Sequence, residues 1–154
     1  MIKINVLITN NYWKKYILNP ELYLKKQIRK LNKNNNFFKN KRIEFSLMLT
    51  ENKKIRQLNK KFRNKNRSTD VLSFPFYEKK KLSKLLKNKE MFYLGDIIVN
   101  LNKIIINTKK KNFKIEFDKL WIHGLLHLLG SRHKFNKDYF KMKKLENIFL
   151  NSIN

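Results

Sequence analysis

The sequence predicts a single α/β domain of the α+β type, in which a mixed sheet of about four strands packs against about five helices. Strand-like and helix-like segments follow one another without strict alternation, which argues against a regular doubly wound fold. The chain has 154 residues, within the size range of one domain, and its 42% hydrophobic content is enough to form a core. Residues 1–154 are therefore expected to form one domain.

Four segments have the apolar pattern of β-strands. Segments 2–8 and 43–49 carry an aliphatic or aromatic residue at every second position, which is typical of a strand with one buried face. Segments 71–74 and 94–99 are short apolar runs, and the first of them is stopped by Pro75. Together they predict the four strands of the sheet.

Capping residues and helical periodicity predict helices between and after these strands. Asn19, Pro20 and Glu21 fit the N-cap, the first helical position and the first-turn acid of a helix that ends near Leu31. The tract 32–40 is then expected to be a polar loop, and the Lys-rich stretch 78–90 a loop or an irregular helix. The other predicted helices begin at Thr50–Glu51, run from Asn100 to about Thr108 and from Phe113 to about Leu129, and begin at Asn136.

Composition narrows the kinds of partner and compartment. Thirty-seven basic and 11 acidic residues give a formal charge of +26, which favours a polyanionic partner such as nucleic acid. We attribute about half of this excess to compositional drift, because Lys, Asn and Ile abound while Ala is absent. No apolar run is long enough for a signal sequence or a membrane helix, so a soluble cytoplasmic protein is expected.

The only three histidines, His123, His127 and His133, fall within eleven residues. The first two are one helical turn apart on a helix that is apolar on nearly every face, so both imidazoles can reach one metal ion. Gly130 can take the left-handed conformation that ends this helix and lets His133 return. Three imidazoles with an open fourth position describe a catalytic zinc site, and one zinc per chain is expected. The alternative is that one or two are core histidines bonded to the backbone.

The same histidine spacing occurs in metzincin proteases, which carry a general-base glutamate directly after the first histidine. Here that position is Gly124, so peptide hydrolysis by that mechanism would lack its base. A zinc peptidase-like hydrolase is therefore the second hypothesis.

Several motifs resemble those of the YbeY endoribonucleases, the bacterial ribosomal RNA maturation factors. They are His-Gly-Leu-Leu-His-Leu-Leu-Gly-Ser-Arg-His at 123–133, Leu-Asn with Phe-Arg within 58–63, Ser-Thr-Asp-Val-Leu-Ser-Phe-Pro at 68–75 and Leu-Gly-Asp-Ile at 94–97. Together these segments cover roughly residues 43–150, and the first forty residues match only in general character.

The resemblance implies a zinc ion on the three histidines and cleavage of single-stranded RNA in ribosomal RNA maturation and ribosome quality control. RNA and the ribosome would then be the partners. It also implies a functional arginine at Arg63, whose guanidinium could bind two nonbridging phosphate oxygens. The alternative role for Arg63 is a solvated cation at a helix end that satisfies terminal carbonyls.

Asp70 and Asp96 are the acids best placed to orient a histidine ring by accepting its N–H, although each could instead hold a turn. Arg67 and Arg132 are candidate RNA contacts. Ser131 and Arg132 stand where the family usually has an aromatic residue and Asp, and a cation here disfavours a divalent ion unless it faces solvent or phosphate. A noncatalytic RNA-binding or ribosome-binding remnant is therefore the third hypothesis.

Overall fold

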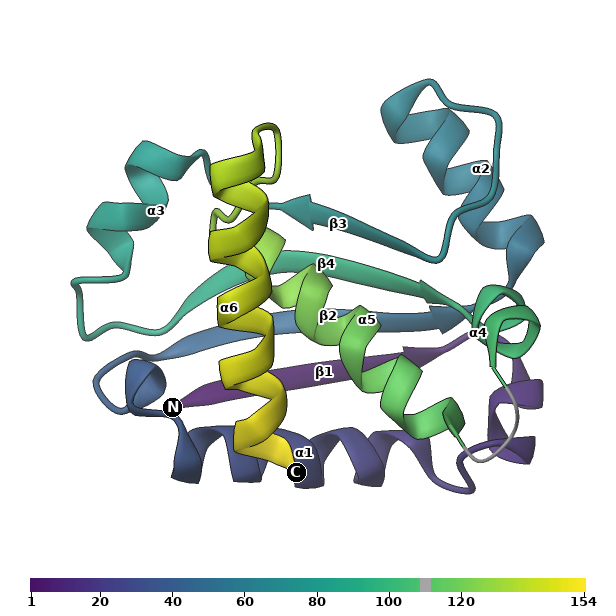
Figure 1. The fold of residues 1–154 in the computed structure, drawn as a ribbon, viewed down its shortest axis with the longest axis horizontal. Helices are drawn as coiled ribbons and strands as arrows, with labels where there is room; N and C mark the ends of the chain where they lie inside the picture. The colour runs from purple at the N-terminus through teal and green to yellow at the C-terminus, as the bar shows by residue number, and fades with distance from the viewer. Residues whose placement is uncertain (109–111) are drawn as a thin grey trace.

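The four predicted strands form one mixed sheet in the order β1-β2-β4-β3. Strands β1, β2 and β4 are parallel, while β3 pairs with β4 in the antiparallel direction at the edge. The computed structural model describes residues 1–108 and 112–154 (Figure 1). Their elements are β1 (Ile2–Ile8), η1 (Asn11–Lys15), α1 (Pro20–Asn34), η2 (Asn36–Phe38), β2 (Ile43–Thr50), α2 (Asn52–Arg63), β3 (Val71–Pro75), α3 (Lys79–Leu85), β4 (Phe92–Asn100), α4 (Leu101–Asn107), α5 (Phe113–Leu128) and α6 (Asn136–Ile153).

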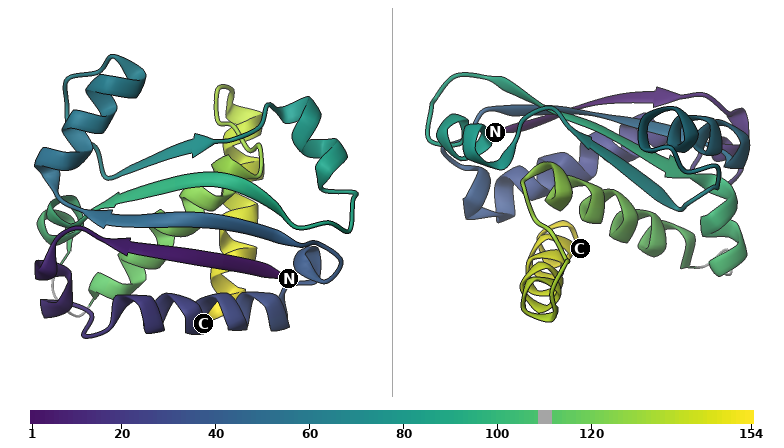
Figure 2. Two further views of the ribbon diagram at one scale, coloured as in Figure 1. Left: turned by 180° about the vertical axis from the view of Figure 1, so that it is seen from behind. Right: turned by 90° about the horizontal axis from the view of Figure 1, so that it is seen from above.

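Helices α1, α5 and α6 lie on one face of the sheet, with α6 outermost (Figure 2). Helix α5 packs against β3 and β4, and α6 packs against α5 and α1. The alternation predicted for β2 is confirmed, because Ile43, Phe45, Leu47 and Leu49 are all fully buried under these helices. The main core therefore lies between the sheet and α5, and α5 is the element that carries the histidines.

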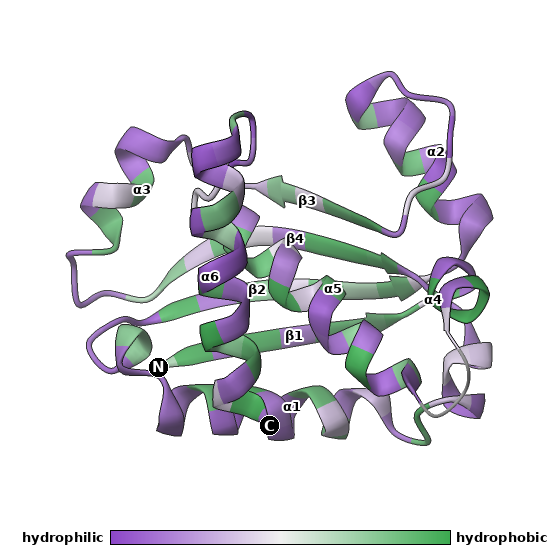
Figure 3. Cartoon of the chain, viewed as in Figure 1, coloured by the Kyte–Doolittle hydropathy of each residue, from purple (hydrophilic) through white to green (hydrophobic). Residues whose placement is uncertain are grey.

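The other face of the sheet is only partly covered. A small second cluster joins Ile55 of α2 to Leu72 of β3 and Ile98 of β4. The strands are mostly hydrophobic along their length while α2 is largely hydrophilic, as Figure 3 shows. Helix α2 therefore sits beside the sheet on few apolar contacts, and its last residue, Arg63, reaches the edge formed by β3.

Several predicted boundaries need correction. The tract 32–40 is not a polar loop, because α1 continues to Asn34 and Phe38 in η2 is fully buried. The stretch 78–90 contains a regular helix, α3, so the described residues hold six α-helices instead of about five. Helix α2 begins at Asn52, one residue after the predicted start at Thr50–Glu51, and its N-cap Glu51 makes no side-chain hydrogen bond. Burial of an apolar side chain by distant elements overrides a polar local composition in the first case.

None of the helices in the described part of the chain combines the length and the apolar character needed to cross a membrane.

Candidate metal centre

The helix that carries the first two histidines approaches the sheet unusually closely at Gly124. A Cβ at this position would lie 2.6 Å from Cγ2 of Ile97 and 3.1 Å from Oγ of Ser73. The Ser73 hydroxyl donates a hydrogen bond of 3.2 Å to the Gly124 carbonyl, which ties α5 to β3. The position at which metzincins carry their glutamate therefore faces the sheet in this protein, and only glycine fits there.

Gly130 ends the helix as the sequence predicts. Its φ is +89°, and the amide of Ser131 donates to the Leu126 carbonyl at 2.9 Å, closing the helix end with a left-handed residue. The chain then reverses, so that His133 comes back toward the last turns of α5.

The three imidazoles converge on one point. The Nε2 atoms of His123 and His127 lie 3.0 Å apart, and a ring nitrogen from each of His123, His127 and His133 lies within 4.8 Å of the others. Zinc–nitrogen bonds of about 2.0–2.1 Å in a tetrahedral site place two ligand nitrogens roughly 3.3 Å apart. The helical pair already has nearly this separation, and the exposed His133 follows α5 in an irregular segment from which it can close the remaining gap.

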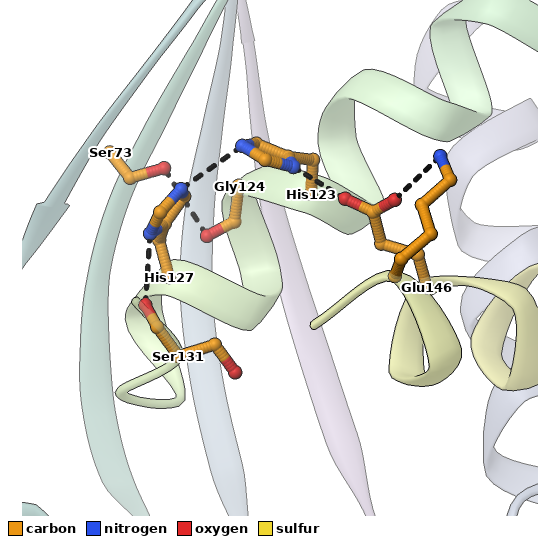
Figure 4. Close-up of polar contacts among 7 residues, drawn as sticks. Ser73, His123, Gly124, His127, Ser131 and Glu146 are labelled. Carbon is orange, nitrogen blue, oxygen red and sulfur yellow. Dashed lines mark hydrogen bonds and ion pairs between the residues drawn. The ribbon is translucent and has the colours of Figure 1, made fainter. Parts of the chain in front are cut away.

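The Nδ1 atom of each helical histidine is hydrogen-bonded to an oxygen acceptor (Figure 4). His123 Nδ1 lies 2.5 Å from Oε1 of Glu146, and His127 Nδ1 lies 3.0 Å from the carbonyl oxygen of Ser131. A carbonyl or carboxylate oxygen can only accept, so each ring carries a proton on Nδ1, and Nε2 is the nitrogen left to bind a metal ion. Two ring nitrogens that face each other at 3.0 Å need a positive charge between them, either a shared proton or a metal ion. The donor set therefore fits a metal ion.

The electrostatics of the site keep His127 in its metal-binding form. Burial, together with the charges of His123, His133 and Arg63, lowers the pKa of His127 to about 4, although the hydrogen bond to Ser131 opposes this. His127 is therefore neutral at pH 7. Burial acts to raise the pKa of Glu146, but hydrogen bonds from His123 and Lys143 outweigh it and hold that pKa below its ordinary value. Glu146 therefore faces His123 as a carboxylate.

Glu146 is a site residue that the sequence analysis missed. It belongs to α6, and its side chain is only 12% exposed. A signal was present in the sequence, because Met142, Phe149 and Ile153 form the buried stripe of α6 and Glu146 occupies the same helical face. An acid on an otherwise apolar stripe indicates a buried partner.

The histidines and Arg63 line the same cavity, which has a volume of about 670 Å³. Arg63 is the last residue of α2, and the following Asn64 takes the left-handed conformation at φ +55°, which turns the chain toward β3. Arg132 also lines this cavity and is exposed, so its guanidinium has access to solvent. In the described part of the chain neither arginine forms a salt bridge. Both predicted cations are thus available to an anionic ligand.

The two aspartates expected to orient a histidine form hydrogen bonds with other residues instead. Asp70 lines the cavity, but its Oδ1 accepts from the Val71 amide at 2.8 Å and from the Thr69 hydroxyl at 3.2 Å, which caps the start of β3. Asp96 accepts from the Tyr93 hydroxyl at 2.6 Å and lines a groove on the opposite face of the sheet. The expectation for both is corrected, because the carboxylate that contacts an imidazole is that of Glu146. Arg67 lies in a neighbouring cavity that shares Arg63 with this one.

Comparisons with known proteins show the family and the fold of the chain. Residues 7–154 match the family model described as endoribonuclease YbeY, so the similarity extends well before residue 43. The chain is 40% identical over 153 residues to endoribonuclease YbeY of Pelagibacter ubique, covering 96% of this chain and 94% of that protein. It is 32% identical over 158 residues to endoribonuclease YbeY of Bartonella henselae, covering 99% and 94%. A solution structure from Thermotoga maritima has the same fold, with a TM-score of 0.60 at 24% identity, covering 99% of this chain and 89% of that one.

Proposed function

The chain belongs to the YbeY family of endoribonucleases, and from this premise we propose that it is a zinc-dependent enzyme that cuts single-stranded RNA. Its substrate is a ribosomal RNA precursor, its partner is the ribosome, and its place is the cytoplasm, in ribosomal RNA maturation and ribosome quality control. The observation that carries the proposal is the convergence of three imidazoles beside Arg63 in one cavity.

His123, His127 and His133 would hold one zinc ion per chain. Neutral imidazole is a preferred ligand of zinc, whereas magnesium and calcium take oxygen ligands, and the chain has no cysteine to compete. When bound, zinc supplies Lewis-acid polarisation of the phosphate or activation of a water molecule. Glu146 and the Ser131 carbonyl keep the two helical rings turned so that Nε2 points into the cavity.

Arg63 is proposed to bind the phosphate that is cut. Cleavage of a phosphodiester builds negative charge on the nonbridging oxygens, and a guanidinium can donate to two of them at once. Arg132 adds a second cation at the cavity wall, and Arg67 adds one in the adjoining cavity. These positive charges can bind the phosphates of an RNA backbone. The bound phosphates in turn reduce the repulsion between the arginines and a nearby zinc ion.

The two other hypotheses are less well supported. A zinc peptidase of the metzincin kind needs a glutamate where this chain has Gly124, and a larger residue there would collide with Ile97. A noncatalytic remnant would follow if Arg132 kept zinc away. Arg132 is exposed, however, and its guanidinium is free to turn toward solvent or phosphate.

The test uses protein purified without a histidine tag and loaded with zinc. We expect close to one zinc per chain by elemental analysis and cleavage of a single-stranded RNA but not of the matching duplex. His123→Ala should lose both zinc and cleavage. Arg63→Ala should keep its zinc and cut roughly 10²–10³-fold more slowly, because one preorganised donor to the developing charge is gone. Arg29→Ala, an equal charge loss on the exposed face of α1, is the matched control.

Two outcomes would redirect the proposal. Cleavage of casein-like peptides without cleavage of RNA would favour the peptidase hypothesis. Persistent absence of zinc under zinc-replete conditions, with RNA binding intact, would favour the noncatalytic one. If Arg63→Ala cuts RNA at the rate of Arg29→Ala, the role assigned to Arg63 is wrong.

A further inference from the structure

A second cavity, of about 370 Å³, adjoins the histidine cavity and shares Arg63 and Asp70 with it as walls. We propose that this second cavity is a phosphate subsite, which holds the backbone of a single RNA strand beyond the phosphate that lies at the histidines. The proposal rests on the proposed function, since it assigns a path to the same substrate.

The charge of the second cavity is strongly positive and is not neutralised by the protein. Its lining includes four basic side chains, those of Arg63, Lys65, Arg67 and Lys103. Within residues 1–108 and 112–154 none of these four forms a salt bridge. The one acid of the lining, Asp70, already accepts hydrogen bonds from the Thr69 hydroxyl and the Val71 amide. A surplus of unpaired cations around a hollow is the electrostatic footprint of a site for phosphate groups.

One wall of the cavity is the turn after α2, and hydrogen bonds to residues of α2 fix the backbone of this turn. The side-chain amide of Asn59, which is 2% exposed, donates to the Arg67 carbonyl at 2.9 Å. The Lys65 amide donates to the Asn59 carbonyl at 3.2 Å. Arg56 Nε donates to Oδ1 of Asn66 at 2.9 Å across the same turn. The turn therefore presents Lys65 and Arg67 from a fixed backbone, which lowers the entropy cost of binding a strand there.

The opposite wall is α4, which carries the half-buried Lys103. The side-chain amide of Asn100, the N-cap of α4, donates to the Thr69 carbonyl at 2.9 Å and so joins this helix to the segment before β3. Both walls are thus hydrogen-bonded to the segment that leads into β3, and they place cations on two sides of the second cavity.

Because the two cavities share a wall, occupancy of the second cavity should depend on the length of the RNA strand. A dinucleotide has one phosphodiester, and this group fills the histidine cavity alone. A strand of six nucleotides has phosphates on either side of the scissile one, and those on one side would pass Arg63 into the second cavity. Affinity should therefore rise with length, and the rise should depend on Arg67 and Lys103.

The experiment compares two double variants of the zinc-loaded protein, Arg67→Gln with Lys103→Gln, and Arg29→Gln with Lys33→Gln. Both lose two positive charges, but Arg29 and Lys33 lie exposed on α1, away from either cavity. A fluorescent hexauridylate should bind the first double variant about tenfold more weakly than the second at about 0.15 M salt, since both lost cations are phosphate contacts. The slope of log affinity against log salt should fall by about 1.4, or roughly 0.7 per contact. Diuridine monophosphate should bind both variants alike.

Equal hexauridylate affinity and equal salt slope in the two double variants would overturn the subsite while leaving RNA cleavage by the wild type untouched. Failure of the wild type to cut any RNA would instead overturn the proposed function. Should the first double variant melt at a lower temperature than the control, the single change Lys65→Gln, at an exposed side chain of the same cavity, repeats the comparison. It should then weaken hexauridylate binding about threefold and leave diuridine monophosphate unchanged, and an unchanged hexauridylate affinity overturns the proposal.

Discussion

Two carboxylates lie beside the two halves of α5, one on the helix itself and one on α6, and their surroundings differ in kind. Asp118, in the first half of α5, accepts hydrogen bonds from the Tyr23 hydroxyl at 2.7 Å, the Gln27 amide at 3.0 Å and the Trp121 indole N–H at 2.8 Å. Glu146 of α6 contacts the His123 imidazole beside the second half and, at 3.1 Å, the Lys143 ammonium group. One acid is surrounded by neutral donors, and the other by groups that carry or can carry positive charge.

The pKa values of the two acids move in opposite directions as a result. Burial raises the pKa of Asp118 above its ordinary value, and the three neutral donors, together with the charge of Lys30, only partly offset it. Hydrogen bonds from His123 and Lys143 lower the pKa of Glu146 in spite of its burial. Asp118 therefore ties α5 to α1 as a structural contact, whereas Glu146 is an ionised group that sets the orientation of a metal ligand. The partners of a buried carboxylate, more than its burial, indicate its role.

The largest effect that would test this comparison is on stability. Asp118→Ala should lower the free energy of unfolding by about 3 kcal/mol, because the Tyr23 hydroxyl and the buried Trp121 indole N–H lose their acceptor and the buried Gln27 amide keeps only the Tyr23 oxygen. Zinc stoichiometry should be unchanged in the protein that remains folded. The measurement is chemical denaturation monitored by tryptophan fluorescence, with elemental analysis of the same samples.

The control for this prediction is how the stability lost in Asp118→Ala depends on pH. A group whose pKa is raised on folding contributes its full stabilisation below its unfolded pKa, here 3.8, and loses it as the pH rises through the folded value. The stability difference between wild type and Asp118→Ala should therefore shrink from pH 4 to pH 7. A difference that grows over this range would show that Asp118 is held as a carboxylate, and the contrast with Glu146 would fail.

The second effect is on metal affinity. Glu146→Gln should weaken zinc binding about 10–100-fold, because an amide is a poorer acceptor for the His123 Nδ1 proton and no longer fixes the ring. The free energy of unfolding of the zinc-free protein should change by less than about 1 kcal/mol, because Glu146 lies beside the cavity and outside the apolar core. Competition with a chromophoric chelator measures the affinity. Unchanged affinity would mean that the helix alone orients His123.

The smallest effect concerns the charge beside His133. Arg132→Asp should tighten zinc binding by about three- to tenfold, because it replaces an exposed cation near a divalent ion with an anion in a strongly screened position. Combined with Glu146→Gln it should recover only part of the loss, since charge at the rim cannot orient His123. Full recovery in the double variant would show that Glu146 acts through charge and not through orientation. The chelator competition assay distinguishes the two results.

Much of the fold and of the site follows from local sequence patterns. Alternation predicted the strands at 2–8 and 43–49 because side chains of a strand point to opposite faces in turn. Capping predicted the start of α1, where the Asn19 side chain accepts from the Leu22 amide. Helical spacing and Gly130 predicted that His123, His127 and His133 come together, and in the structure a ring nitrogen from each of them lies within 4.8 Å of the others. These are features that residues within about one or two turns decide among themselves.

The sequence by itself therefore determined the four strands, most of the helices, the histidine group and the family, and it placed Arg63 among the candidates. Only the tertiary structure decided which acid faces a histidine. Glu146 is 23 residues from His123 and reaches it because α6 crosses α5, whereas Asp96, on a strand next to the core, points to the opposite face of the sheet. Periodicity reports which face of an element is buried, but not which other element covers that face. The order of strands and the crossing of helices depend on packing across the whole chain, and that packing selected Glu146.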